Sequence, residues 1–273
     1  MKKHYFFFLV LFSFFYLAGQ TQTVEKSDKT IIKNFYINLG GSYSDYQDVD
    51  YSNVQQCGFG GNFKLGFSHQ KRGKHFWEAG SVFNITIDHA KTHDEGKATV
   101  MYGNVYFKYL KGINNHFYVG GRIDAFDNYF RIYANLSNNS TVASAGNYLY
   151  GSVIYQTNIN DQWRFMAIGD LFLLGFQNEL PAFAMNYSPN RINNGEVDYQ
   201  DPALGDPSSY PYFAFCYIGN NFILKTEFLF MYKKRISVAY NWEMRRFSEV
   251  SGYPTTWAMH NLVFRFNIIH REK

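Results

Sequence analysis

Residues 77–88, WEAGSVFNITID, place most of their apolar side chains on one parity and their polar and charged side chains, except Ser81, on the other. Trp77, Phe83 and Ile87 share one parity, whereas Glu78 and Asp88 share the other. Successive side chains of a β-strand point to opposite faces. The stretch therefore predicts a strand with one apolar face and one polar face.

The same alternation recurs along most of the chain. Two less regular segments, 183–187 and 212–218, bring the expected number of strands to twelve. A ten-strand register is the alternative, and the two registers differ in where they place residues 188–210: a link at the short-turn end, or part of one large loop at the other end. The nine further regular segments are 34–39, 59–67, 101–109, 117–125, 149–156, 164–173, 224–230, 236–245 and 261–268.

Composition indicates what the apolar faces meet. Aromatic residues make up 20% of the chain, with 28 Phe and 23 Tyr. Mean hydropathy is nevertheless −0.31, although 46% of the residues are hydrophobic. Aromatic rings favour membrane interfaces, and a barrel with a polar interior combines an apolar exterior with a low mean hydropathy.

The start of the chain predicts export. Lys2 and Lys3 precede an apolar run over 5–18, and the small residues Ala18 and Gly19 follow. That order is typical of a signal peptide, and the run is short for a membrane-spanning helix. We expect residues 1–20 to be the signal peptide and 21–273 to form one barrel domain.

These observations together predict an all-β protein: a closed antiparallel transmembrane β-barrel in the outer membrane of a Gram-negative bacterium. The alternative is a secreted sandwich or lipocalin-like barrel, whose polar face usually carries more Lys, Glu and Thr. Here the polar face is rich in Tyr and Asn, which favours the membrane barrel. Outer-membrane lipid and the barrel-assembly machinery are the expected partners.

Three stretches also resemble a known group of proteins. They are YKKRISVAYNWEMRRF at 232–247, WAMHNLVFRFNII at 257–269 and LPAFAMNYSPN at 180–190. Together with the signal peptide and the Phe/Tyr-rich strands, they resemble uncharacterised outer-membrane β-barrel proteins of the Bacteroidota. The resemblance implies a barrel and its location, and it implies no particular activity.

Charged residues on the polar parity form the candidate functional site. Acids and bases are nearly balanced, and a buried charge needs a partner, so we expect pairing across strands. Paired charges would plug the lumen, whereas unpaired ones would line a conduit or a pocket. The predicted network comprises Lys64, Glu78, Lys108, Arg122, Asp124, Arg164, Asp170, Lys225, Glu227, Glu243, Arg245 and Arg265.

Other chemistry has little support in the sequence. His260 lies on the apolar parity without a serine motif beside it, and the cluster Asp88, His89, His93 and Asp94 reads as a solvated loop. No phosphate-binding, dinucleotide-binding or zinc-protease motif occurs, and no basic tract favours nucleic acid. We expect no metal or cofactor.

Cys57 and Cys216 are the only cysteines, and we expect two packed thiols in preference to a bridge. Three functions stay open at this point: passage or binding of a small polar or amphiphilic solute, a structural or adhesion role with a plugged lumen and loops as contact surface, and a lipid-facing enzyme.

Overall fold

The structure is a computed structural model. It describes residues 30–48, 52–90, 97–134, 141–180, 212–219, 221–247 and 255–272. The predicted signal peptide, the predicted strand at 183–187 and the segment 188–210 lie outside the described residues. No helix among the described residues is long and apolar enough to cross a membrane.

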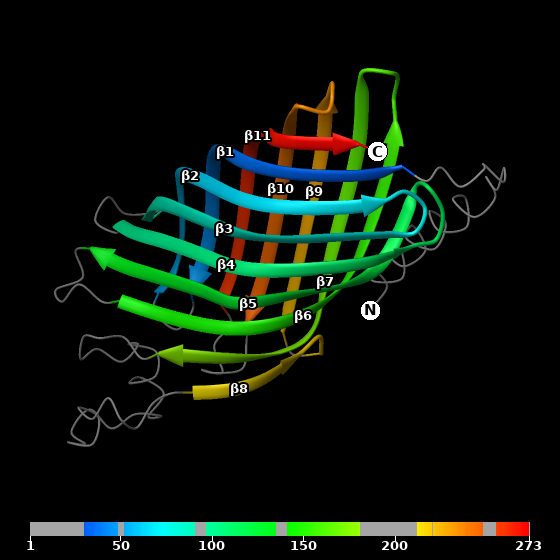
Figure 1. The fold of residues 1–273 in the computed structure, drawn as a ribbon. Helices are drawn as coiled ribbons and strands as arrows, with labels where there is room; N and C mark the ends of the chain where they lie inside the picture. Colours follow the sequence, from blue (N-terminus) through cyan, green and yellow to red (C-terminus); the bar gives the residue numbers. More distant parts are fainter. Residues whose placement is uncertain are drawn as a thin grey trace, which may run out of the picture.

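Eleven β-strands make up the described part of the chain (Figure 1). The first seven have 16 to 20 residues each. A tilted strand needs about 9–11 residues to cross the hydrocarbon of a bilayer. The strands are β1 (Ile31–Asp48), β2 (Ser52–Lys71), β3 (His75–Ala90), β4 (Lys97–Gly112), β5 (Phe117–Ala134), β6 (Thr141–Asn158), β7 (Trp163–Leu180), β8 (Tyr212–Tyr217), β9 (Phe222–Tyr232), β10 (Ile236–Phe247) and β11 (Thr255–Glu272).

The sheet closes on itself as a barrel. Strands β1 to β7 pair in sequence order, β7 pairs with β9, and β11 pairs back to β1, all antiparallel. Strand β8 pairs with the second half of β7 while β9 pairs with its first half, so β8 and β9 follow one another along the same neighbour. The predicted closed antiparallel barrel is confirmed.

The strand count within the described residues is the ten-strand alternative, not twelve. Residues 212–217 form a strand as expected, but this strand extends β9 along β7 and adds no separate position to the circle. Strand β7 therefore ends, and β8 begins, at the same end of the barrel. The link between them, which includes 188–210, starts and finishes there and does not join the opposite end.

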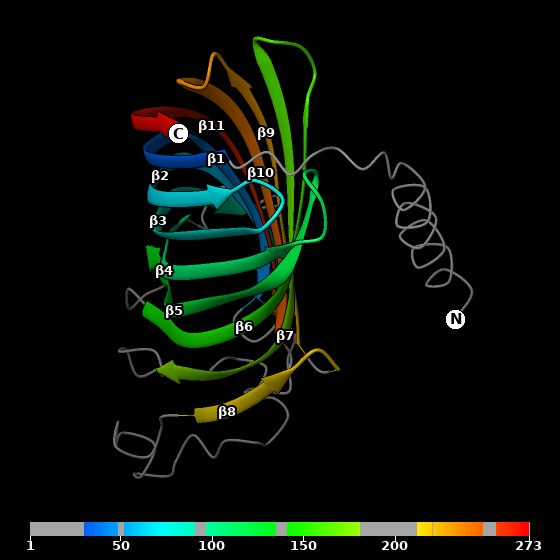
Figure 2. The same cartoon turned by 45° about the vertical axis from the view of Figure 1, so that its right-hand side comes forward.

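The two ends of the barrel differ. Short connections at 72–74, 113–116, 159–162 and 233–235 gather at one end, called here the turn end. The links 49–51, 91–96, 135–140, 181–211 and 248–254 start and finish at the other end, called here the loop end. Figure 2 shows the same wall of strands from a second direction.

Side-chain parity follows the alternation in the sequence. Exposed apolar residues, including Phe63, Phe107 and Phe264, cover the outer wall of the barrel. The opposite parity points into the lumen, where polar and charged side chains such as Asn62 and Lys108 are buried. An apolar exterior around a polar interior is the pattern of a membrane barrel.

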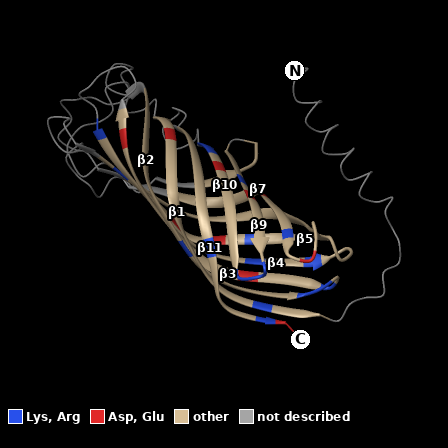
Figure 3. Cartoon of the chain, turned by 90° about the horizontal axis from the view of Figure 1, so that it is seen from above, with Lys and Arg blue, Asp and Glu red and all other residues tan. Residues whose placement is uncertain are grey.

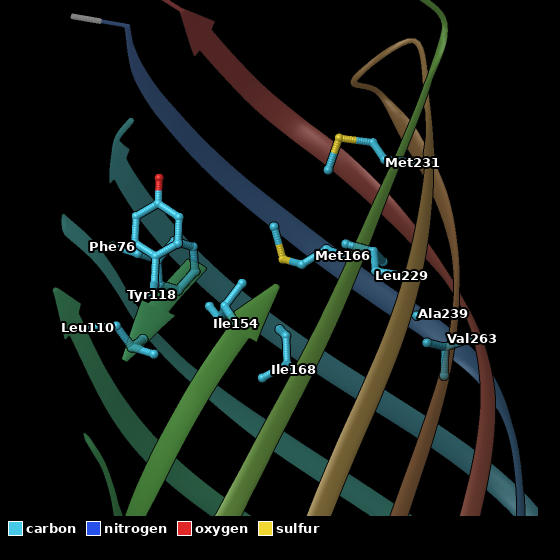
Figure 4. Packing of buried hydrophobic residues seen from close by; sticks show 10 residues of the cluster. All are labelled: Phe76, Leu110, Tyr118, Ile154, Met166, Ile168, Leu229, Met231, Ala239 and Val263. Atoms are coloured by element: carbon cyan, nitrogen blue, oxygen red, sulfur yellow. The ribbon is translucent and has the colours of Figure 1, made fainter. Parts of the chain in front are cut away.

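The lumen is not polar throughout, which sequence parity alone did not predict. Ten buried apolar residues, among them Phe76, Leu110 and Met231, pack together inside the barrel near the turn end (Figure 4). A second buried group, including Tyr46 and Trp257, lies near the loop end. The barrel is narrow enough for inward side chains from opposite walls to meet and fill it.

A β-bulge in β5 changes the parity of that strand. Two residues separate Asp124 from Asp127, while their partners on β6 are only two positions apart, so β5 holds one extra residue. Phe126 occupies the bulge with a φ of 52° and points outward, 70% exposed. Both aspartates consequently face the lumen.

Candidate functional site: the charged lumen

The predicted charges lie on the inner wall, between the two apolar groups. Nine of the twelve predicted residues are less than 10% exposed, and Glu227 and Glu243 are only slightly more accessible. Burial at this level removes most of the hydration that would stabilise an isolated charge. Each of these buried charges therefore needs a partner of opposite charge or a hydrogen bond.

One group of four charges is centred on Glu227. The ammonium of Lys64 lies 3.1 Å from Glu227 and 3.4 Å from Glu78, and Arg265 also pairs with Glu227. The Tyr36 hydroxyl donates a hydrogen bond of 2.7 Å to Glu78. Two bases thus meet two acids, and the group, called here the Glu227 group, is neutral.

A larger group is centred on Asp124. Arg122 lies 2.5 Å from Asp124 and 3.0 Å from Asp170, and Lys225 lies 2.7 Å from Asp124. Lys108 completes the shell of Asp170 at 2.9 Å. Two cations against each buried carboxylate compensate its charge where bulk water does not reach it.

The Asp124 group continues toward the loop end. Arg245 reaches Asp127 through two hydrogen bonds of 2.6 and 2.8 Å and lies 2.5 Å from Glu243. Lys225 also approaches Glu243 at 3.3 Å. Four bases therefore meet four acids in this group, which is neutral as well: Lys108, Arg122, Lys225 and Arg245 with Asp124, Asp127, Asp170 and Glu243.

Tyr106 connects the two groups. Its hydroxyl donates to Glu78, while the guanidinium of Arg122 lies 4.3 Å from the centre of its ring and the ammonium of Lys64 lies 5.3 Å away. A cation above an aromatic face is attracted by the ring quadrupole, more strongly where water is excluded. The tyrosine thus stabilises cations of both groups at once.

Arg164 is the one predicted residue that does not join this network. It faces the lumen near the turn end, where its guanidinium donates to the amide oxygens of Gln70 at 3.0 Å and of Gln156. Among the described residues it forms no ion pair. The other eleven predicted residues take part in one group or the other.

Asp127 is a buried lumen acid that strand parity missed. In an unbroken strand it would point outward with Ala125, and the bulge at Phe126 turns it inward. A signal was present in the sequence, because the apolar parity of β5 switches to Phe126, Phe130 and Ile132 after the bulge. The lumen tyrosines were missed for another reason. Their ring faces lie against cations from other strands, and these contacts cannot be read from the alternation within one strand.

A small cavity remains between the two groups. Its volume is about 60 Å³, which is room for a few water molecules. Asparagines supply much of its wall, and the side-chain oxygens of Asn62 and Asn104 are buried there without a protein partner. Water is the occupant that fits these acceptors and this volume.

Two of the other candidate residues, His260 and Asp88, make hydrogen bonds to neighbouring hydroxyl groups. His260 faces outward on β11, and its Nδ1 lies 2.7 Å from the hydroxyl of Tyr240. Asp88 is buried and accepts hydrogen bonds from Ser44, whereas His89 is exposed. His93 and Asp94 lie outside the described residues, and the described part of the chain holds no group of His, Cys, Asp or Glu arranged for a metal ion.

Both cysteines are free thiols in the structure. Cys216 is buried in the lumen against Gln177, and Cys57 is partly buried on β2.

No model of a protein family matches the chain, and no curated protein matches it. Among solved structures the chain is similar to the outer-membrane protease OmpT of Escherichia coli, with 8% identity, 91% of this chain and 100% of that chain covered, and a TM-score of 0.42. It is also similar to neisserial surface protein A, with 10% identity, 87% and 99% covered, and a TM-score of 0.34. A mutant of the TodX monoaromatic hydrocarbon channel gives 7% identity, 89% and 91% covered, and a TM-score of 0.32.

Proposed function

We propose that this chain is an outer-membrane β-barrel with a plugged lumen, which acts as a structural or adhesion protein through the loops at its loop end. The observation that carries the proposal is the pairing of the lumen charges. Six bases and six acids form two neutral groups across the barrel, with apolar side chains packed toward both ends.

Location in the outer membrane follows from the exterior. Exposed Phe, Leu, Ile and Val side chains cover the outer wall on most strands. A protein surrounded by water rarely exposes so large a continuous apolar surface. Removal of residues 1–20 as a signal peptide and insertion by the barrel-assembly machinery belong to the same proposal. The Bacteroidota-type origin rests on the sequence resemblance of the three stretches given above.

Passage of a small polar or amphiphilic solute has less support. A conduit needs a continuous wet path, and the cavity between the charge groups holds only about 60 Å³. A pore lined by charge also tends to carry an excess of one sign, as in the charged rings of selective channels. Within the two groups each acid has a basic partner, so these charges hold the walls together and neither group carries a net charge.

Conductance tests the plug directly. The full barrel, refolded from the mature chain, is inserted into planar bilayers, and insertion is verified by heat-modifiable migration on a gel. We expect little steady current from the inserted protein. Large and stable currents from the unmodified barrel would overturn the plug and favour the conduit.

A matched variant makes a low current informative. Replacing Tyr106 and Arg122 together by alanine removes the ring and the cation that join the two groups, and it widens the cavity. We expect this variant to insert and to show currents that the unmodified barrel lacks. A variant that folds and inserts without any gain in current would mean that the apolar groups toward the two ends close the lumen without the paired charges, which would overturn the observation on which the proposal rests.

A further inference from the structure

The outer wall carries a second concentration of charge that the plugged lumen does not explain. Lysines and arginines gather at the end of the barrel where the C-terminus lies, which is the turn end (Figure 3). On strands β11, β1, β2, β3 and β4 four of these cations face outward. They are Arg271, Lys33, Lys71 and Lys111.

Strand register places these cations side by side. Arg271 lies directly opposite Lys33, and Lys33 lies opposite His69. On the next row Lys71 lies opposite His75, and His75 lies opposite Lys111. Facing residues on neighbouring strands have Cβ atoms about 5 Å apart, and like charges directly opposite one another are destabilising.

No acid among the described residues offsets this charge on the outer face. Glu272, which follows Arg271 in the chain, lies opposite Ile32 on the inner parity and forms an ion pair with Lys234. The outward positions of the five strands near the turn end hold no Asp or Glu. An anion from outside the chain would therefore relieve the repulsion.

Aromatic rings adjoin the cations on the side of the apolar wall. The imidazole rings of His69 and His75 stack with centroids 5.5 Å apart, and His69 stacks on Trp77 at 5.7 Å. Beyond them Trp77 contacts Phe67 at 5.2 Å between centroids, and the exposed apolar wall begins. Rings with one apolar and one polar edge favour the headgroup level of a bilayer.

We propose that this patch, called here the basic patch (Lys33, Lys71, Lys111 and Arg271 with His69, His75 and Trp77), binds an anionic phospholipid headgroup of the membrane leaflet at the turn end. The inference rests on the proposed membrane location. Continuity with the apolar wall favours a lipid over a free phosphate, because acyl chains of the same molecule would lie on Phe67 and Phe107. Each cation at such a surface favours an anionic headgroup by about fivefold.

Brominated lipids test the patch through Trp77. The full barrel is inserted into phosphatidylcholine vesicles that contain either brominated phosphatidylglycerol or brominated phosphatidylcholine, and fluorescence quenching is compared with that of Trp77→Phe. The difference reports the lipid beside Trp77. We expect phosphatidylglycerol to be enriched there severalfold, and the enrichment to fall as salt is raised.

Two variants with the same change in charge separate the patch from the turn end as a whole. Lys33→Gln/Lys71→Gln/Lys111→Gln should abolish the enrichment. Lys74→Gln/Lys233→Gln/Arg235→Gln, which alters exposed turn residues at the same end, should keep most of it.

Three results would count against the inference in distinguishable ways. Equal quenching by both lipids in an inserted barrel overturns the patch and leaves the proposed membrane location intact. Equal loss in both triple variants overturns the patch in favour of a diffuse charge effect. Failure to insert into any vesicle overturns the membrane location itself.

Discussion

At the scale of single residues, the lumen shows why a buried charge requires two kinds of partner. Arg122 has carboxylates at its edges, Asp124 and Asp170, and the ring of Tyr106 against its face. A planar guanidinium can use both at once, because its donors lie in the plane and its faces stack on aromatic rings. A lysine at this position would satisfy the carboxylates and lose the stacking.

Removal of the Arg122 charge should be costly. Arg122→Gln leaves Asp170 with one cation, Lys108, and Asp124 with one cation, Lys225, in a buried site away from bulk water. We expect a loss of about 3–5 kcal/mol in the free energy of unfolding, measured by denaturant titration of the barrel in lipid vesicles.

Arg164→Gln is the matched control on the same inner wall. Arg164 donates to amides and pairs with no acid among the described residues, so its removal strands no carboxylate. Its loss in unfolding free energy should be clearly smaller than that of Arg122→Gln. Equal losses would mean that the ion pairs contribute no more than neutral hydrogen bonds, which would remove the physical basis of the plug.

At the scale of elements, the bulge in β5 determines which face its aspartates occupy. Phe126 is the extra residue, and neither the ladder to β4 nor the ladder to β6 has a partner for it. Deletion of Phe126 should restore a regular strand with Asp124 and Asp127 still facing the lumen. We expect this variant to fold and insert, with melting as the measurement.

Deletion of Ile123 shortens the same strand by one residue, but we expect this variant to fail in assembly. The bulge can absorb the missing residue only if Asp124 turns outward and Ala125 turns inward. Asp124 would then leave Lys225 and Arg122 and face lipid, so assembly should fail. Similar behaviour of the two deletions would mean that the register of β5 is not fixed by the lumen charges.

The exterior of β9 gives a second prediction for an element. Phe228 is exposed on the outer wall between Phe165 of β7 and Tyr240 of β10. Phe228→Arg should cost about 2–4 kcal/mol in folding into vesicles if the residue lies near the bilayer midplane. Phe228→Leu is the control and should fold nearly as well, and an equally mild effect of arginine would place this face in water.

The sequence was sufficient for what depends on a period of two. It predicted a closed barrel and the inward parity of the charged residues, because most strands have one apolar face and one polar face. It could not predict features in which the period is interrupted or partners are remote. The bulge in β5 reverses the parity on which Asp127 was assigned. Strand β8 continues β9 along β7, so counting it as a separate strand made the predicted number too high. The apolar groups inside the barrel depend on contacts across the lumen.

At the scale of the whole molecule, the barrel has a chemical polarity between its ends. The turn end carries the basic patch and further exposed lysines and arginines in its short turns, whereas all the long links start and finish at the loop end. Barrels of the outer membrane have short periplasmic turns and longer outside loops. In the proposed location the basic end therefore faces the periplasm, where the membrane leaflet consists of phospholipid.

Orientation in the cell can be tested with an inserted protease site. A recognition sequence placed in the link 135–140 should be cut when the protease is applied to intact cells, because both β5 and β6 reach that link at the loop end. The same sequence placed at 159–162, in the turn between β6 and β7, should be protected until the outer membrane is opened. Both insertions replace polar connections outside the strands, so the barrel itself should be preserved, as heat-modifiable migration would show. The reverse pattern would invert the barrel in the membrane and place the basic patch against the outer leaflet, and cutting at both sites in intact cells would leave the protein outside the membrane altogether.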